Sequence, residues 1–368
     1  MVQPAGCILH LFRRIQACQW VRFESRHLQR FNNLRPMKKT VAFSKNATNL
    51  FFHILTRCNL KCSHCYINKK EHGKNTLPID TIETWLEVFA SKNKAANVIF
   101  LGGEPTLHPD LPKAIKKAKS IGYSSITVDT NGYLFHDILS KVDPDGVDYF
   151  SFSLDGATRK TNDAIRGKGS YDTCIAGIRK AVLMGFTTSL IYTVSTKNIH
   201  ELERIAPLLK DLGIHRFFIQ VIGIRGKSAE SRHEKLQVSR TQWLKTIPEI
   251  GQKIACLGIT VTYPKVFLNP DEPFECAGLV AENYFIFPNG RVYRCPLCED
   301  YPLHSMRFKD DVLVDAPKIN ENDLFALNIP EGCVMNRLVQ PGNLSYNRDG
   351  TPKYKIACCL LKEQIRIP

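Results

Sequence analysis

Three cysteines, Cys58, Cys62 and Cys65, follow an apolar run at 50–55 with the spacing C-x3-C-x2-C. Three thiolates on one short loop can each bind a different iron of a cubane iron–sulfur cluster. The fourth iron then has no protein ligand and is open to a small molecule, and an open position makes a metal centre catalytic rather than structural. A structural zinc ion would need a fourth ligand. His64 lies between two of the thiols, where it can hardly turn onto the same ion.

The remaining cysteines are unevenly distributed. The chain holds 13 cysteines, of which six lie after residue 275. Clustered thiols without a recognisable secretory signal favour metal ligands over disulfides and predict a cytoplasmic protein. Cys174 and Cys256 stand alone on segments with helical apolar spacing, and we expect both to be buried as small hydrophobic residues.

Composition limits the class of protein more than its partner. The 368 residues are 43% apolar and 23% charged, which excludes global disorder, and no apolar run reaches the roughly 18–20 residues of a membrane span. The net charge of +15 permits an anionic substrate, nucleic acid or acidic lipid without choosing among them. Residues 1–36 hold six arginines and one acid. We expect this segment to be a flexible extension or to precede a true start at Met37; an organelle signal and an ordered arm are the alternatives.

Strand-like and helical patterns alternate from residue 49 to about 260. Apolar runs predict six strands, at 50–55, 97–101, 124–129, 147–153, 187–194 and 215–221. Helical spacing separates them, and Trp243, Ile247, Ile250 and Ile254 predict a further helix. Such alternation indicates a parallel sheet with right-handed crossovers, and six units suit an open, partial (β/α)6 TIM-like barrel of the α/β class. We place a barrel at 45–260 and a small Cys-rich α+β domain at 270–368.

The cysteine motif resembles the signature of the radical S-adenosylmethionine (SAM) superfamily, C-x3-C-x-φ-C on the loop after the first barrel strand. His64 takes the φ position, and Tyr66 follows the last cysteine, as is common there. The turn Leu101–Pro105 (LGGEP) follows the second strand, where the family binds the amino group of SAM. Gly102 and Gly103 allow close backbone approach, and Glu104 brings negative charge near an ammonium.

Later strand ends carry further matches over roughly residues 49–230. The resemblance implies that Ser153 and Asp155 contact SAM, with Thr130 and Asn131 as additional candidates. Arg166 is a candidate partner for the SAM carboxylate because its fork suits that anion; an exposed arginine on a barrel helix is the alternative. Val194 ends the fifth strand, where the backbone meets adenine, and VIGIRGKSAE (221–230) resembles the family's G-x-I-x-G-x-x-A-E element.

The C-terminal cysteines form a second constellation, Cys276-x13-Gly290-x4-Cys295-x2-Cys298. It resembles the opening hairpin of the auxiliary-cluster (SPASM/twitch-like) extension of peptide and sulfatase maturases, in which the glycine permits the tight turn. The full extension has seven cysteines, whereas here the pattern after Cys298 is not intact. We therefore expect one auxiliary [4Fe–4S] cluster, bound by these three cysteines and one other; two clusters or zinc are the alternatives. The candidates for the fourth ligand are Cys333, Cys358 and Cys359.

The resemblance implies a radical SAM oxidoreductase or maturase whose cofactors are a SAM-binding [4Fe–4S] cluster, SAM and the auxiliary cluster. A low-potential flavodoxin or ferredoxin would supply the electron, and a 5′-deoxyadenosyl radical would abstract hydrogen from substrate inside the barrel. The extension favours a peptide or protein side chain as substrate, and the alternative is a small-molecule precursor in cofactor biosynthesis. A non-catalytic, basic metal-binding protein that binds nucleic acid is a remote alternative, because it leaves the LGGEP turn unexplained. No membrane partner and no catalytic side chain are predicted.

Overall fold

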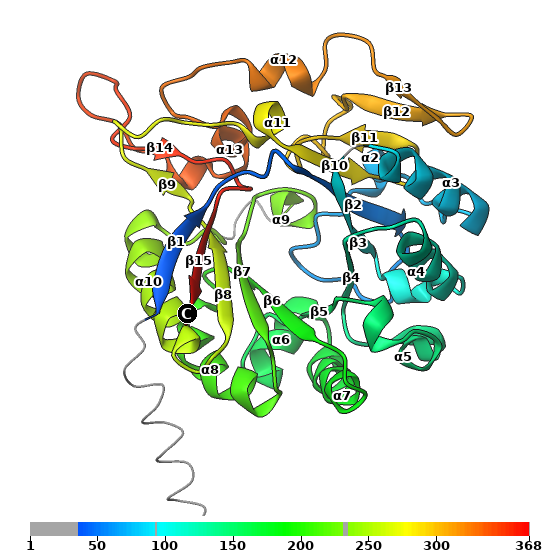
Figure 1. The fold of residues 1–368 in the computed structure, drawn as a ribbon. Coiled ribbons are helices and arrows are strands. Elements are labelled where there is room, and N and C mark those ends of the chain that lie inside the picture. The colour runs from blue at the N-terminus through cyan, green and yellow to red at the C-terminus, as the bar shows by residue number, and fades with distance from the viewer. Residues whose placement is uncertain (1–35, 93, 231–234, 368) are drawn as a thin grey trace, which may run out of the picture.

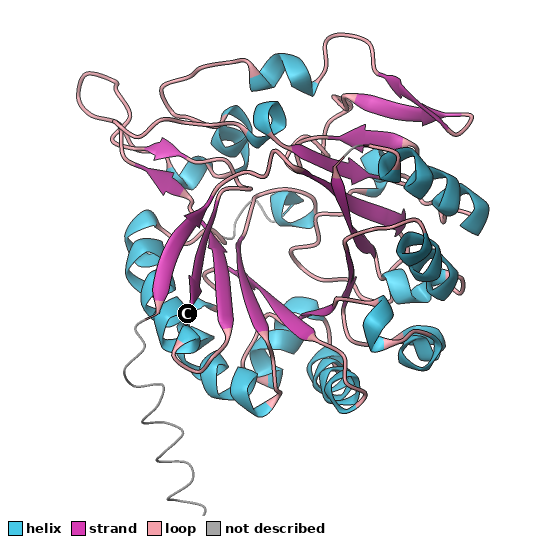
Figure 2. Ribbon diagram, in the orientation of Figure 1, coloured by secondary structure: helices cyan, strands magenta, loops and turns pink. Residues whose placement is uncertain are grey.

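The computed structural model describes residues 36–92, 94–230 and 235–367, so the predictions made for residues 1–35 lie outside the described part of the chain. Seven parallel strands form a curved wall with helices on its outer side (Figures 1 and 2). In order along the sheet they are β8 (Thr260–Pro264), β7 (Arg216–Val221), β6 (Thr188–Val194), β5 (Tyr149–Ser153), β4 (Ser125–Thr130), β3 (Ala95–Gly102) and β2 (Ala47–Leu55).

The prediction of a partial TIM-like barrel is confirmed, and each of the six predicted strands is present. The seventh strand, β8, was missed by the sequence analysis, although Val261 and Tyr263 alternate with two threonines in it. The helices are α3 (Ile79–Ala90), α4 (Leu111–Ser120), α5 (Ile138–Lys141), α6 (Arg159–Arg166), α7 (Ser170–Leu183), α8 (Leu202–Asp211) and α10 (Arg240–Ala255).

Alternation along each strand separates two faces of the sheet. In β2, Leu50, Phe52 and Ile54 are fully buried and belong to the main hydrophobic core between sheet and helices. The residues between them face the barrel interior. Because parallel strands end at one edge of the sheet, the loops after β2 to β6 converge there, where a barrel places its functional side chains.

The C-terminal region continues the same sheet at both edges. β10 (Glu282–Ile286) pairs in parallel with β2, and the predicted hairpin to β11 (Arg291–Tyr293) is confirmed. β12 (Met306–Lys309) and β13 (Val312–Asp315) extend this edge. At the opposite edge, β15 (Lys362–Arg366) lies antiparallel between β8 and β1 (Met37–Val41). One sheet therefore crosses the proposed boundary at 260–270, and the division into domains stays a prediction.

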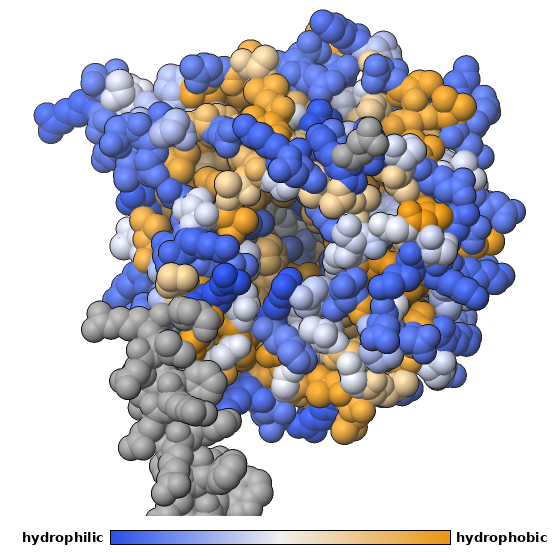
Figure 3. All heavy atoms as spheres, viewed as in Figure 1, coloured by the Kyte–Doolittle hydropathy of each residue, from blue (hydrophilic) through white to orange (hydrophobic). Residues whose placement is uncertain are grey.

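Short elements complete the structure, and the C-terminal region lies between the two edges of the curved sheet (Figure 1). A two-stranded sheet joins β9 (Phe267–Leu268) to β14 (Lys355–Ile356). The short helices are α2 (Lys69–His72), α9 (Lys227–Glu230), α11 (Ala277–Val280), α12 (Glu321–Phe325) and α13 (Val334–Val339). None of the helices in the described ranges is long and apolar enough to cross a bilayer. The face shown in Figure 3 is mostly hydrophilic, with scattered apolar residues.

The two isolated cysteines differ. Cys174 in α7 is 1% exposed, as predicted. The prediction for Cys256 is wrong, because this residue is exposed at the C-terminal end of α10. The buried face of α10 includes Ile250 and Ile254. A residue two positions beyond Ile254 lies about 200° around a helix and so faces solvent.

Candidate functional site

The loop after β2 carries Cys58, Cys62 and Cys65, and the LGGEP turn after β3 packs directly beneath it. The amide of Gly103 donates to Leu55 O over 3.0 Å, and the amide of Glu104 donates to Arg57 O over 3.0 Å. A Cβ on Gly103 would lie 2.2 Å from Arg57 O, and one on Gly102 would lie 2.1 Å from Leu55 O. Both glycines are therefore required for the turn to approach the backbone of the cysteine loop.

The three thiols of this loop are partly buried. Burial raises the pKa of Cys58 to about 11 and raises the pKa of Cys62, so iron binding must displace protons. Within the described ranges, no three Cys, His, Asp or Glu side chains converge as ligands of one ion. A cubane cluster binds each thiolate through a different iron, so three thiols without a fourth protein ligand fit a cluster with one open iron.

Both carboxylate oxygens of Glu104 accept hydrogen bonds from residues of its own turn and of the end of β4. Its buried carboxylate accepts from the hydroxyls of Thr106 (2.6 Å) and Thr130 (2.8 Å) and from the amide of Asn131 (2.7 Å). The side-chain amide of Asn131 in turn lies 3.8 Å from Cys58 Sγ and 2.8 Å from Asn59 Oδ1. Thr130 therefore ties the end of β4 to the LGGEP turn, and Asn131 ties it to the cysteine loop. Contact of Glu104 with SAM stays a prediction.

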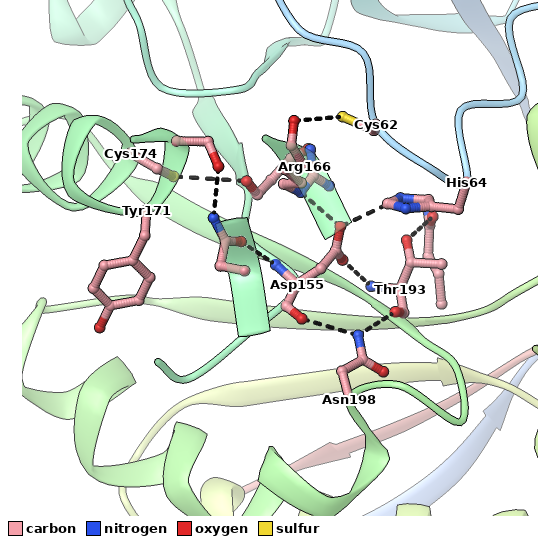
Figure 4. A network of polar contacts seen from close by, with 12 residues as sticks. Cys62, His64, Asp155, Arg166, Tyr171, Cys174, Thr193 and Asn198 are labelled. Atoms are coloured by element: carbon pink, nitrogen blue, oxygen red, sulfur yellow. Dashed lines mark hydrogen bonds and ion pairs between the residues drawn. The ribbon is translucent and has the colours of Figure 1, made fainter. Parts of the chain in front are cut away.

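Asp155 is the centre of the network in Figure 4. Its Oδ2 lies 2.6 Å from Arg166 Nε and 3.3 Å from His64 Nε2, and its Oδ1 accepts from the amide of Thr193 over 2.7 Å. The side chain of Asp155 has no exposed surface. His64 is thus directed at Asp155, and the pairing explains how a guanidinium is tolerated at this depth.

Arg166 is 8% exposed, so the alternative of an exposed helix arginine is wrong. Its carbonyl lies 3.8 Å from Cys62 Sγ, which places α6 against the cysteine loop. The predicted pairing of Arg166 with the SAM carboxylate stays a prediction, because its Nε already contacts Asp155. Ser153 O accepts from Cys174 Sγ over 3.6 Å, and Val194 O accepts from the amide of Ile222 over 3.2 Å.

The sequence analysis identified Tyr66 but missed several polar residues that lie near it. The hydroxyl of Tyr66 lies 2.8 Å from His53 Nε2, and its ring lies 4.7 Å beneath the guanidinium carbon of Arg225. On β4, Asp129 bonds to Ser151, and burial raises the pKa of Asp129 to about 7. The strict alternation of β4 could have indicated that Asp129 faces the barrel interior. No local pattern marks His53, whereas Arg225 lies within the segment 221–230 that the sequence analysis noted without giving this residue a role.

The C-terminal cysteines gather around one cavity. The sixth, Cys298, is buried beside Cys295, whose carbonyl accepts its amide over 3.1 Å. Burial raises the pKa of Cys276 to about 11, whereas a hydrogen bond from Cys359 lowers the pKa of Cys358. The five cysteines that line the cavity are Cys276, Cys295, Cys333, Cys358 and Cys359.

Glu321 of α12 organises the backbone beside this cavity. Its carboxylate accepts from the amides of Arg294 (2.6 Å), Cys295 (3.1 Å) and Ser305 (3.1 Å). Burial raises the pKa of Glu321 to about 7. The loop that carries Cys295 and Cys298 is therefore fixed by one buried acid that the sequence analysis did not identify.

Comparison with known proteins places these observations in a family. Residues 52–209 match the family described as Radical SAM superfamily. The Fe-coproporphyrin III synthase of Methanosarcina barkeri is 31% identical over 247 residues, which cover 66% of this chain and 61% of that protein. A probable GTP 3′,8-cyclase of Saccharolobus islandicus is 31% identical over 185 residues, 49% of this chain and 59% of that protein. The chain thus spans about three fifths of the length of these curated relatives.

Two solved structures share the fold at low sequence identity. SuiB of Streptococcus suis superposes with a TM-score of 0.64 and 14% identity, covering 92% of this chain and 81% of SuiB. The anSMEcpe protein with bound AdoMet gives a TM-score of 0.53 and 13% identity, covering 77% of this chain and 81% of that protein. The resemblance predicted from the cysteine motif is confirmed for residues 52–209, which form a radical SAM domain.

Proposed function

We propose that this chain cleaves SAM reductively at a [4Fe–4S] cluster bound by Cys58, Cys62 and Cys65. The observation that carries the proposal is the packing of the LGGEP turn against the backbone of the cysteine loop, supported by the family match over 52–209. When bound, the cluster and SAM supply a 5′-deoxyadenosyl radical that abstracts hydrogen from substrate, with the electron coming from a low-potential flavodoxin or ferredoxin.

The residues of this chain position and shield that chemistry. Gly102 and Gly103 allow the LGGEP turn to pack directly against the backbone of the cysteine loop. Asn131, at the end of β4, contacts Cys58. Asp155 holds Arg166 beside Cys62. The side chains of Glu104, Asn131 and Asp155 already have polar partners, so that these groups need little reorganisation when the cofactors bind.

We further propose a single auxiliary [4Fe–4S] cluster in the C-terminal cavity. Five thiols line one cavity and the sixth, Cys298, is buried beside it, which favours one cluster over two separate ones. A cubane cluster uses four thiolates, so at least one of the adjacent pair Cys358 and Cys359 is spare. The expected ligands remain Cys276, Cys295 and Cys298 with one of the later cysteines.

For the substrate we propose a peptide or protein side chain. SuiB, solved with its precursor peptide SuiA, superposes on 88% of this chain with a TM-score of 0.62. The proposed auxiliary cluster in the Cys-rich region would suit a reaction that withdraws an electron from a large substrate.

A small-molecule cofactor precursor is the second candidate, favoured by the inner face of the sheet. Asp129, Ser151, Ser189 and Arg216 lie in one row across β4 to β7. Barrel interiors are usually filled by branched apolar side chains, so a polar row suits a polar, charged substrate. The curated relatives named for a porphyrin and for GTP are consistent with this candidate.

The test is anaerobic reconstitution with iron and sulfide, followed by iron counting and assay of 5′-deoxyadenosine after reduction by dithionite. We expect about eight irons per chain in the wild type and about four in the Cys58/Cys62/Cys65→Ala variant, with product only from the wild type. Cys256→Ala is the matched control, because this cysteine is isolated and exposed. A fully loaded protein that neither binds nor cleaves SAM contradicts the proposal.

Added substrates then separate the two candidates. Stimulation of 5′-deoxyadenosine formation by GTP or iron coproporphyrin III, together with a modified product, would favour the small-molecule reaction. Stimulation only by a short peptide encoded beside the gene would favour the peptide reaction. Mass spectrometry of the added compound identifies which one has lost hydrogen.

A further inference from the structure

A closed set of contacts links the loop of Cys65 to the loop of Cys298, and nothing in the proposed reaction uses it. Tyr66 follows Cys65, and Glu299 follows Cys298. Between them lies Arg225, from the loop after β7. Its guanidinium carbon lies 4.7 Å from the centre of the Tyr66 ring, and its Nη1 donates to Glu299 Oε2 over 3.0 Å.

Arg225 is largely buried, and its ion pair with Glu299 supplies the counter-charge that a buried guanidinium needs. The side chain of Arg225 is 18% exposed and that of Glu299 is 2% exposed. Nη1 also donates to the carbonyl of Pro296, which lies between Cys295 and Cys298. A planar guanidinium that stacks on one loop and donates twice to another fixes both distance and angle between them, which a lysine ammonium does not.

Aromatic stacking closes the circuit on the other side. Tyr66 OH bonds to His53 Nε2, and the His53 ring stacks on Phe287 with 4.0 Å between centroids. Phe287 also stacks with His72 at 4.1 Å, and His72 Nε2 lies 2.9 Å from the carbonyl of Glu299. His53, His72 and Phe287 are at most 1% exposed. The two loops are therefore joined twice, through Arg225 and through this stack.

The backbone beside Arg225 is locked to the first loop. The amide of Lys227 donates to Cys65 O over 3.0 Å. Gly226 has a φ of +53°, and a Cβ there would lie 2.5 Å from Cys65 O. A displacement of Arg225 is therefore transmitted to the carbonyl of Cys65 without an intervening flexible side chain.

We propose that Arg225 is a positioning residue that sets the geometry of the Cys65 loop from the Cys295–Cys298 loop, so that the two cysteine sites are energetically coupled. This inference rests on the proposed function, because its readout is SAM binding at the cluster of Cys58, Cys62 and Cys65. Coupling between sites in proteins commonly changes affinity by about 5- to 150-fold.

The test titrates the dithionite-reduced, reconstituted protein with SAM and follows the change in the cluster's electron paramagnetic resonance spectrum. We expect Arg225→Met to raise the Kd for SAM about fivefold or more at full iron content. Glu299→Gln should raise it in the same direction, although Glu299 belongs to the other loop. The double variant should bind no more weakly than Arg225→Met alone, since both changes remove one interaction. Arg225→Lys should restore little, because it keeps the charge but loses the planar fork.

Arg291→Met is the matched control. Arg291 Nη1 pairs with Glu71 Oε2 at 2.9 Å and likewise joins the C-terminal region to the barrel side, but it touches neither cysteine loop. If Arg225→Met loses iron, the SAM titration of Glu299→Gln tests the coupling instead, because this variant keeps the stacking of Arg225 on Tyr66. SAM titrations of both variants within twofold of the wild type overturn this inference alone. A wild-type spectrum that does not respond to SAM refutes the proposed function instead.

Discussion

Substitution of Gly103 by alanine isolates the contribution of the LGGEP turn to the cysteine loop. The added Cβ would lie 2.2 Å from Arg57 O, 2.5 Å from Arg57 C and 2.7 Å from Thr56 O. All three atoms are backbone, so no side-chain rotation can relieve the contact. An ordinary contact begins at 3.4 Å, which requires a shift of about 1.2 Å between the turn and residues 56 and 57.

A shift of that size exceeds what metal–ligand distances tolerate, but it costs less free energy than an ordinary domain has to spare. Metal–ligand distances tolerate about 0.2 Å, so Cys58, next to Arg57, would leave its place in the cluster. Overpacking of this kind costs about 1–3 kcal/mol, which a domain of ordinary stability survives. We therefore expect Gly103→Ala to fold, to retain the auxiliary cluster and to lose the SAM-binding cluster.

The assay is iron content after reconstitution, with the melting temperature measured on the same samples. We expect about four irons per chain in the variant against about eight in the wild type, with no 5′-deoxyadenosine formed. Gly146→Ala is the control, because a Cβ there meets no atom within 4 Å and its φ is not positive. A Gly103→Ala protein with the full iron content and normal SAM binding would refute the reasoning.

Three further predictions follow from buried acids. Asp155→Asn should destabilise the fold by about 3–5 kcal/mol in denaturant titrations, because it leaves the Arg166 guanidinium buried without its counter-charge. Asp129 has a pKa near 7 in the folded protein, above its unfolded value, so the folded state binds more protons in this range. The free energy of unfolding of the wild type should therefore fall as the pH rises from about 4 to about 7. Asp129→Asn should make that decline shallower in unfolding experiments, because Glu321, whose pKa is also near 7, still titrates in this window. Glu321→Gln should lower the iron content from about eight to about four, because an amide cannot accept all the backbone donors around Cys295.

Each of these has its own control. Asp172→Asn breaks an exposed pair with Arg159 and should leave the unfolding midpoint unchanged. For Asp129→Asn, a pH dependence that parallels the wild type throughout this window would show that another group titrates there. For Glu321→Gln, Asp323→Asn alters the same helix away from the cysteines; equal iron loss in both variants would indicate a general loss of α12 rather than the loss of the three amide contacts.

The sequence predicted those features that local patterns determine. The six strands and the helix at 240–255 follow from apolar periodicity, and the Cys58–Cys65 motif is contained within eight residues. The hairpin at Gly290 is likewise local. Cys256 shows where periodicity fails, because a residue at the end of a helix can leave the buried face that the preceding turns define.

Long-range pairings could not be predicted, because their partners are separated by many residues and carry no shared motif. Asp155 and Arg166 were each identified, yet each was assigned to SAM rather than to the other. β15 lies beside β8 although about 100 residues separate them in the sequence. Glu321 was not identified for the same reason, because no sequence spacing indicates a buried acid that accepts hydrogen bonds from distant backbone amides.

The pairing of Asp155 with Arg166 bears on how an anion could bind beside Cys62. The guanidinium contacts Asp155 through Nε, which leaves the two terminal nitrogens for other acceptors. A carboxylate arriving there would meet Arg166 and also the negative charge of Asp155, and His64 lies 3.3 Å from that same carboxylate. Binding of an anion would then be helped by a proton on His64, yet burial lowers the pKa of His64 and opposes this. Asp155 therefore orients Arg166, but its negative charge reduces the attraction of Arg166 for anions. The planar geometry of the guanidinium, rather than charge alone, must then select the ligand.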